Sequence, residues 1–206
     1  MAFQRARQAY QIAERRASIL KQARALCAEF GVMDWSLNEL GRRSDVTKSN
    51  LYRYFSSREE ILLVLMHEET RLFASRLHAE TKDRQEMSVA ELSVLIASLY
   101  GRQSLLCDLL CVSASLLENH AELETIRGIK LSGFEDSAMV ASAIARVLRA
   151  VDEEQASQIA FISGIMDSGL WPMARAGAPV QRFADLDGLE RLKMDFPTEL
   201  KRMLEA

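Results

Sequence analysis

The sequence of 206 residues has few helix breakers, with nine glycines and three prolines. No apolar run approaches the length of a membrane span, and the first residues lack the apolar stretch of a secretory signal. No convincing alternation of apolar and polar residues predicts a strand. Three cysteines, an odd number, are typical of reduced thiols rather than of a disulfide framework. We therefore expect an all-α, cytoplasmic protein that makes no membrane contact.

Motifs of catalysis and of metal binding are also missing. The sequence contains no glycine-rich phosphate loop ending in Lys-Ser/Thr, no His-Glu-x-x-His pair and no nucleophile elbow. His67 and His120 each stand beside acidic residues, but neither set has enough ligands on one helical face to close a metal site. We expect no enzyme activity, no cofactor and no metal.

Three helix starts with a hydroxyl cap fall within residues 36–60. Ser36 is followed three residues later by Glu39, which is the spacing of a capping box. Thr47 and Ser57 stand at the other two starts, where their side-chain oxygens can accept from free backbone N–H groups. Only two short helices fit between such closely spaced starts.

These two short helices are predicted over residues 37–44 and 48–55. The second would bury Leu51 and Phe55, four residues apart on one face. Two short helices joined by a three-residue turn form a helix-turn-helix, which places its second helix in the major groove of DNA.

The opposite face of the helix over 48–55 is polar, and its side chains can donate hydrogen bonds to DNA. We predict base contacts from Lys48, Ser49, Asn50 and Arg53. The remaining predicted DNA-binding residues are Ser36, Thr47, Tyr52, Tyr54 and Arg58, which we assign to phosphate contacts, and Asn38. The alternative is an ordinary polar surface on a small helical corner.

The charge distribution favours DNA binding although the net charge is −3. Residues 1–60 hold eleven basic and seven acidic residues, a net charge of +4, and the rest hold fifteen basic and twenty-two acidic ones, a net charge of −7. A positive head on a negative body is expected to orient towards DNA in one way. Arg5 and Arg7 precede the head, on a segment that is either a DNA-contacting arm or a mobile tail.

The head resembles the DNA-binding domain of the tetracycline-repressor (TetR) family of one-component transcriptional regulators, over roughly residues 15–65. The resemblance rests on Ile19-Leu20, Ala25-Leu26, Phe30-Gly31, Ser36 through Leu40, Val46-Thr47-Lys48, Leu51-Tyr52, Tyr54-Phe55 and Ser57-Arg58-Glu59. It implies a homodimer that binds a near-palindromic operator in double-stranded DNA and usually represses until a small-molecule effector occupies the C-terminal domain.

The chain departs from the family pattern at four positions. Gly41 replaces the usual Ala, Asp45 a Gly, Tyr54 a His and Arg58 a Lys. Asp45 is tolerable in the turn because Asp is one of the few residues that enter the left-handed region. Tyr54 and Arg58 keep hydrogen-bond donors for phosphate.

After the head, the pattern predicts a bundle of longer amphipathic helices. They are expected over 59–82, 88–100, 103–118, 121–151 and 152–173, followed by a loop over 174–195 and a last helix after Pro197. The predicted domains are a helix-turn-helix DNA-binding domain at 1–60 and a helical ligand-binding and dimerisation domain at 61–206.

A stripe of small residues on the helix over 152–173 bears on dimerisation. Ala156, Ala160, Gly164 and Ser168 recur every four residues and would let another helix come close. The stripe alone fits packing within one chain as well as a dimer seam. The family resemblance implies a four-helix dimer seam built from the two helices nearest the C-terminus.

An effector pocket is expected between the middle helices of the body. The candidate ligand-binding residues are Tyr100, Cys107, Cys111, Met139, Phe161 and Trp171. Each of them also fits a plain core position. Cys107 and Cys111 share a helical face, so they could sense oxidants or bind a soft metal, although buried inert thiols are the more common case.

The sequence therefore predicts a DNA-binding regulator, with a helical adaptor or ligand-free regulator acting through protein partners as the alternative. Mutation of Asn50 and Tyr52 separates these hypotheses, because it removes DNA binding only in the first. Repression and activation are not separable from the sequence.

Overall fold

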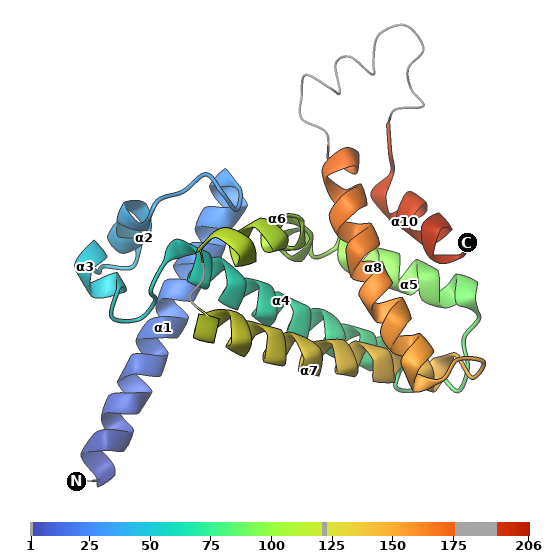
Figure 1. Cartoon of the computed structure of the whole chain (residues 1–206), viewed down its shortest axis with the longest axis horizontal. Helices are drawn as coiled ribbons and strands as arrows, with labels where there is room; N and C mark the ends of the chain where they lie inside the picture. Colours follow the sequence, from blue (N-terminus) through green and yellow to red (C-terminus); the bar gives the residue numbers. More distant parts are fainter. Residues whose placement is uncertain (1, 121–122, 176–192) are drawn as a thin grey trace, which may run out of the picture.

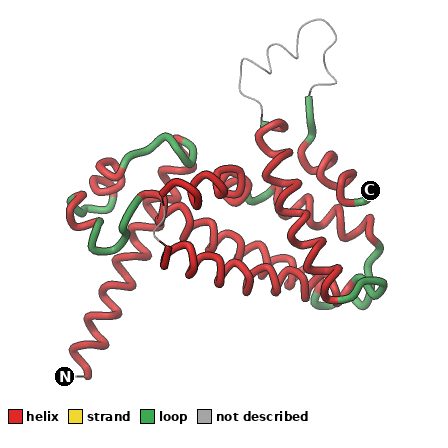
Figure 2. The backbone as a smooth tube through the Cα atoms, in the orientation of Figure 1, coloured by secondary structure: helices red, strands yellow, loops and turns green. Residues whose placement is uncertain are grey.

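A computed structural model of the chain describes residues 2–120, 123–175 and 193–206. All regular elements in these ranges are helices (Figure 2). They are α1 (Ala2–Phe30), α2 (Leu37–Arg43), α3 (Lys48–Leu51), α4 (Arg58–Thr81), α5 (Val89–Gly101), α6 (Ser104–His120), α7 (Leu123–Val147), α8 (Glu153–Ala174) and α10 (Phe196–Leu204). The predicted all-α fold is confirmed.

The helices form a small head and a larger body, joined by α4 (Figure 1). In the head, α2 and α3 lie beside α1, whose N-terminal half projects away from the rest of the molecule. In the body, α7 lies along α4, and α10 packs against α5 and α8. α4 thus runs from the head into the body, and Leu109 and Leu116 of α6 also pack in the core of the head.

The core of the head extends into the first half of α4. Leu40, Leu51 and Phe55 are buried together with Ile61 and Leu65 of that helix. α4 is continuous across the predicted boundary between residues 60 and 61, and that boundary stays a prediction. Apolar contacts of α4 therefore hold the head.

The core of the body is formed by α4, α5, α6, α7, α8 and α10. Phe73 of α4 stacks on Tyr100 of α5 with ring centroids 4.3 Å apart. Trp171 of α8 meets Phe196 of α10 edge-on at 4.8 Å. The first contact fastens α5 to α4, and the second fastens α10 to α8.

The predicted helix bounds agree closely with the structure except in two places. The helix expected over 121–151 ends at Val147, and the one expected over 48–55 is regular only over Lys48–Leu51. Most of the expected loop, residues 176–192, lies outside the described residues.

Among the described residues, no single helix combines the length and the apolar content needed to cross a membrane. Only α5 and the first part of α6 reach that content when taken together, across a bend of 86°.

Candidate functional site

The corner between α2 and α3 is held by hydroxyl caps at both helix starts. Ser36 Oγ accepts from the Glu39 amide at 3.2 Å, and Thr47 Oγ1 accepts from the Asn50 amide at 3.2 Å. Ser57 caps α4 in the same way, accepting from the Glu60 amide at 3.0 Å. The three caps predicted from the sequence are confirmed, and they fix where the recognition helix begins.

The capping box expected at Ser36 is only half formed. The Glu39 carboxylate binds Arg42 and Arg43 instead of the Ser36 amide, with oxygen–nitrogen distances of 2.7 and 2.9 Å. Hydrogen bonds from these two guanidinium groups lower the pKa of Glu39 to about 2. Arg43 also reaches Glu29 of α1 at 2.7 Å, so this cluster fastens α2 to α1.

The turn between α2 and α3 is tight. Asp45 has a φ of 52°, the left-handed conformation that the sequence predicted it could adopt. At Gly41, a Cβ atom would lie 2.6 Å from the carbonyl oxygen of Val46, too close for any larger residue without a shift of the backbone. The glycine in place of the usual alanine therefore allows the turn to pack against α2.

α3 buries its apolar face and exposes its polar one. Leu51 and Phe55 are buried in the head core, as predicted. The chain continues after Leu51 as turns, with the Tyr54 and Phe55 amides donating to the Leu51 carbonyl at 2.9 and 3.0 Å. This keeps Phe55 pointing inward although the regular helix has ended.

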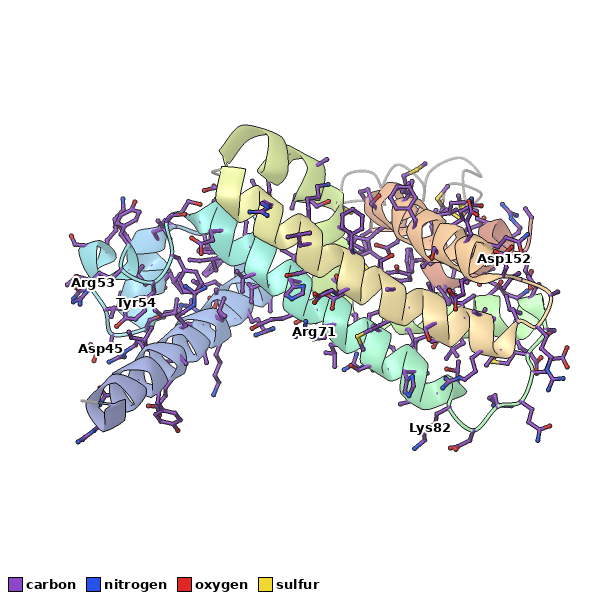
Figure 3. The ribbon with its side chains drawn as sticks, turned by 60° about the horizontal axis from the view of Figure 1, so that its bottom comes forward. Asp45, Arg53, Tyr54, Arg71, Lys82 and Asp152 are labelled. Atoms are coloured by element: carbon purple, nitrogen blue, oxygen red, sulfur yellow. The ribbon has the colours of Figure 1, made fainter. Side chains whose placement is uncertain are left out.

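The predicted DNA-binding residues gather at the end of the head away from the body. Those exposed to solvent are Ser36, Asn38, Thr47, Lys48, Ser49, Asn50, Tyr52 and Arg53, and Tyr54 is half-buried. Figure 3 shows Arg53 and Tyr54 together at this end, close to Asp45. Their contact with DNA stays a prediction, and their exposure leaves them free to make it.

Arg58 has a role inside the head that the sequence does not predict. Its Nη1 donates to the carbonyls of Met33 and Trp35 at 2.8 and 3.1 Å, so it holds the segment between α1 and α2. Arg16, which carries no sequence signal of its own, donates to the carbonyl of Tyr54 and stacks on the ring of Phe55 at 4.1 Å. Arg16 therefore supports the end of the recognition element from α1.

A cavity of about 280 Å³ lies in the body between α4, α5, α6, α7 and α8. Tyr100 and Phe161, two of the predicted ligand-binding residues, line it. Thr70 and Phe73 also line it, and they lie on the helix that enters the head.

The other candidate ligand-binding residues lie elsewhere. Met139 is 44% exposed and lines none of the described pockets. Cys111 and Trp171 face a separate hollow beside the head, where the indole donates to Asp108 Oδ1 at 2.7 Å. Cys107 is buried, with its sulfur 3.3 Å from the carbonyl of Tyr100. Helical spacing alone does not separate these environments.

Buried polar groups lie next to the cavity. Burial raises the pKa of the Cys107 thiol far above its ordinary range and that of Cys111 to about 11, which disfavours the reactive thiolate. Asp167 of α8 is fully buried, and neither of its carboxylate oxygens has a hydrogen bond of good geometry to a described residue. Burial raises the pKa of Asp167 to about 7, against a smaller opposing effect of the Cys107 thiol.

The small-residue stripe of α8 faces the body of its own chain. Ala156 is fully buried, and Ala160, Gly164 and Ser168 line the cavity. That Ala156, Ala160, Gly164 and Ser168 belong to a dimer seam stays a prediction, and within one chain this face of α8 packs against the body and borders the cavity.

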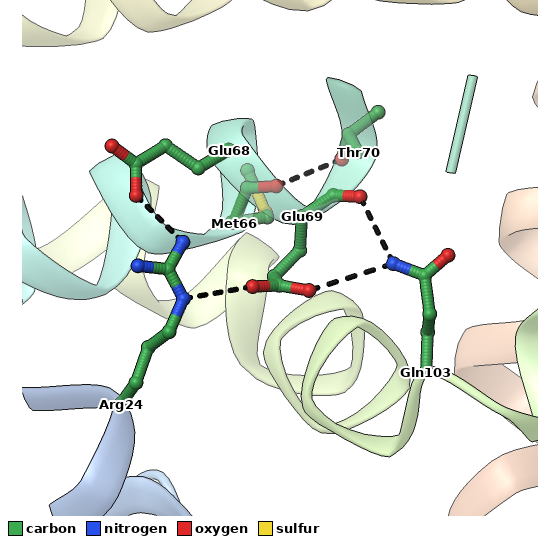
Figure 4. A network of polar contacts seen from close by, with 6 residues as sticks. All are labelled: Arg24, Met66, Glu68, Glu69, Thr70 and Gln103. Atoms are coloured by element: carbon green, nitrogen blue, oxygen red, sulfur yellow. Dashed lines mark hydrogen bonds and ion pairs between the residues drawn. The ribbon is translucent and has the colours of Figure 1, made fainter. Parts of the chain in front are cut away.

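A chain of polar contacts connects the head with the body (Figure 4). Arg24 of α1 donates to Glu68 and Glu69 of α4 at 2.6 and 2.9 Å. Glu69 also accepts from Gln103, just before α6, at 3.3 Å through its carbonyl and 3.4 Å through its carboxylate. The contacts therefore join α1, α4 and the start of α6 beside the cavity.

A helix-turn-helix head joined by one helix to a body with an internal cavity defines a one-component DNA-binding regulator. The family model for tetR-family bacterial regulatory proteins matches residues 19–65, and that for the tetracyclin repressor-like C-terminal domain matches residues 67–206. The chain belongs to the TetR family of transcriptional regulators.

Solved structures of other regulators share the fold. A TetR/AcrR-family regulator from Thermobifida fusca is 23% identical, with 93% of this chain and 96% of that chain covered and a TM-score of 0.54. FadR from Bacillus subtilis, solved with stearoyl-CoA, is 19% identical, with 91% and 96% covered and a TM-score of 0.50. FadR from Bacillus halodurans, a fatty acid degradation regulator, is 16% identical, with 92% and 93% covered and a TM-score of 0.52. A comparison with curated protein sequences gave no significant match.

Proposed function

We propose that this regulator is a repressor that binds a near-palindromic operator as a homodimer in the cytoplasm and leaves it when a small molecule enters the body. The observation that carries this proposal is the surface of α3. Lys48, Ser49 and Asn50 are exposed while Leu51, on the same short helix, is buried. A helix with one polar, exposed face and one buried, apolar face can enter a major groove without exposing the core of the head.

Dimerisation follows from the size of the head. One short recognition helix reads only a few base pairs, so specific binding needs two symmetric copies about one helical turn apart. Exposed apolar side chains on α7 and α8 offer a surface for the second copy. They include Leu131, Phe134 and Ile162, which do not line the cavity.

The effector would act through α4. The cavity touches this helix at Thr70 and Phe73, and its first half carries Ile61 and Leu65 in the core of the head. A ligand that shifts α4 changes the separation of the two heads in the dimer. A coupling of roughly 1 to 3 kcal/mol would lower operator affinity by several-fold to about a hundredfold.

Selection of bound sequences from random duplex DNA at moderate salt tests the proposal. We expect a near-palindromic consensus, which then serves to screen small molecules for release of the protein. Asn50→Ala and Tyr52→Ala are expected to abolish binding to this consensus and to leave the dimer intact. Gln85→Ala, which changes an exposed amide at the far end of the body, is the control.

The alternative is a helical adaptor that acts through protein partners. Under that alternative no duplex is enriched, and Asn50→Ala and Tyr52→Ala have no effect on function. Enrichment of one consensus with loss of binding in both variants rejects it.

A further inference from the structure

The hydroxyl groups that line the cavity have mostly used their protons. Thr70 Oγ1 donates to the carbonyl four residues earlier at 2.9 Å, and Ser113 Oγ and Ser168 Oγ donate to carbonyls three residues earlier at 2.8 and 2.9 Å. A hydroxyl has one proton and two lone pairs, so these three side chains can only accept hydrogen bonds from a ligand.

The two remaining hydroxyls are those of Tyr100 and Ser137, and each can both donate and accept. Ser137 makes no hydrogen bond with the residues that the structure describes and keeps one proton. Acceptors thus outnumber donors on the cavity wall.

The charges around the cavity disfavour an anion. None of the described residues that line it carries a formal charge. Arg71, next to Thr70, lies 3.3 Å from Asp136 through Nε, and Asp136 also lies 2.6 Å from His67 Nδ1. Asp167, next to Ser168, is buried without a cation of its own in the described part of the chain. A ligand carboxylate or phosphate placed here would face lone pairs and lose its hydration without a partner.

From these observations we propose that the cavity binds an uncharged, mostly apolar molecule that donates a hydrogen bond, as an alcohol or a phenol does. This assignment rests on the proposed function, because it names the effector of the same site. The apolar part of the ligand would contact Phe73, Leu106 and Val140, and its hydroxyl proton would be accepted by Ser168.

The size and the opening of the cavity fit a small molecule. Its volume of about 280 Å³ is just below the roughly 300–1,000 Å³ typical of ligand pockets. Phe161 and Ile165 line it and are also 66% and 53% exposed, so it opens on the outer face of α8. A ligand can enter there without passing through the head.

Three probes of nearly equal size separate the chemical classes of ligand. Two of them have the same number of heavy atoms, and the third has one more. They are n-octanol, which donates and accepts, heptyl methyl ether, which only accepts, and octanoate, which is charged. We expect n-octanol to bind at neutral pH, the ether to bind roughly five- to tenfold more weakly, as one neutral hydrogen bond predicts, and octanoate not to bind. Calorimetric titration of the full chain gives the three affinities.

Variants locate the binding. Ser168→Ala is expected to remove the preference for n-octanol over the ether, and Gly164→Leu to block both of these probes by filling the cavity next to the Tyr100 hydroxyl. Ser157→Ala is the matched control, since Ser157 makes the same kind of bond to its own helix but lies outside the cavity. Lys130→Ala tests whether an exposed cation on α7 holds an anion at the rim.

The outcomes separate the ligand class from the proposed function. Binding of octanoate as tight as that of n-octanol, whether or not Lys130→Ala removes it, overturns the ligand class. Equal affinities for n-octanol and the ether overturn it as well. Binding of n-octanol that leaves operator affinity unchanged supports the ligand class and contradicts release by an effector at this site.

Discussion

Arg24 of α1 and Glu69 of α4 form an ion pair in which Nε lies 2.9 Å from Oε1. The second carboxylate oxygen of Glu69 accepts from Gln103 at 3.4 Å, so one side chain contacts both the helix that supports the recognition element and the start of α6. The next residue, Thr70, lines the cavity. A ligand that moves α4 therefore either strains these contacts or moves α1 and the start of α6 together with α4.

Glu69→Gln is expected to weaken the coupling between effector and operator. The amide keeps the shape of the side chain but loses the charge that Arg24 and Gln103 share, a difference of about 1 kcal/mol or roughly fivefold. Operator affinity with and without effector gives the coupling factor. Operator affinity without effector should stay within about twofold, because the α3 surface is untouched. An unchanged coupling factor would mean that the signal passes through the apolar contacts of α4 and α6 with the head.

Asp45→Gly is expected to stabilise the head. Asp45 has a φ of 52°, which glycine adopts without the steric cost that a Cβ atom brings. We expect a gain of roughly 0.5 to 1 kcal/mol in the free energy of unfolding, measured by urea denaturation. Asp45→Ala is the control and should destabilise by about 1 kcal/mol, since alanine lacks the local hydrogen bonds that help Asp in this conformation. A loss of stability in Asp45→Gly would show that the Asp side chain itself holds the turn.

Lys48→Ala is expected to change how DNA affinity depends on salt. Lys48, which we predict to contact a base, is exposed at the start of α3, where its ammonium group can also neutralise a phosphate in each half-site. The slope of log affinity against log salt should fall by about 0.9 for each phosphate that is no longer neutralised, hence by about 1.8 for the dimer. Lys82→Ala at the far end of the body (Figure 3) leaves the slope unchanged. Equal slopes for the wild type and Lys48→Ala would place Lys48 away from the backbone.

Much of the head could be predicted from the sequence because its signals are local. Ser36, Thr47 and Ser57 each cap a helix through an amide three residues away, and such a bond depends only on neighbouring residues. The left-handed conformation of Asp45 is equally local. The positions of helices in the body follow from periodicity for the same reason.

The interior of the body could not be predicted because it depends on which helices meet. Ala156 and Gly164 belong to one stripe, yet one is in the core and the other borders the cavity. Cys107 and Cys111 share a helical face but lie against different neighbours. The sequence position of Arg58 predicts a phosphate contact, and only the fold shows its Nη1 bound to the carbonyls between α1 and α2. Long-range packing decides each of these outcomes.

Ile162→Glu is expected to break the dimer while leaving the chain folded. Ile162 is exposed on α8 and does not line the cavity, so the substitution affects the proposed dimer surface without filling the pocket. A charge buried between two copies is costly. Sedimentation should show a monomer with unchanged helical content and with weaker operator binding. Val94→Glu, on an equally exposed side chain of α5, should remain dimeric. A dimeric Ile162→Glu would place the seam on another face.

Asp167 is expected to make the stability of the protein depend on pH in an unusual direction. Its pKa is about 7 in the folded chain and 3.8 for a freely hydrated aspartate, so the folded state holds the proton more tightly. The stability from this group is fully present below the lower pKa and is lost as the pH rises towards the upper one. At roughly 1.4 kcal/mol for each pKa unit, the loss is up to about 4 kcal/mol. Glu39, whose pKa is lowered to about 2, acts in the opposite direction and only at lower pH.

Urea denaturation at about pH 5 and about pH 8 should therefore show a fall in stability for the wild type that is absent in Asp167→Asn. Both proteins keep every other titrating group. The difference between their changes in unfolding free energy with pH is therefore due to Asp167. Parallel slopes would show that its carboxyl is hydrated or paired when the protein is folded.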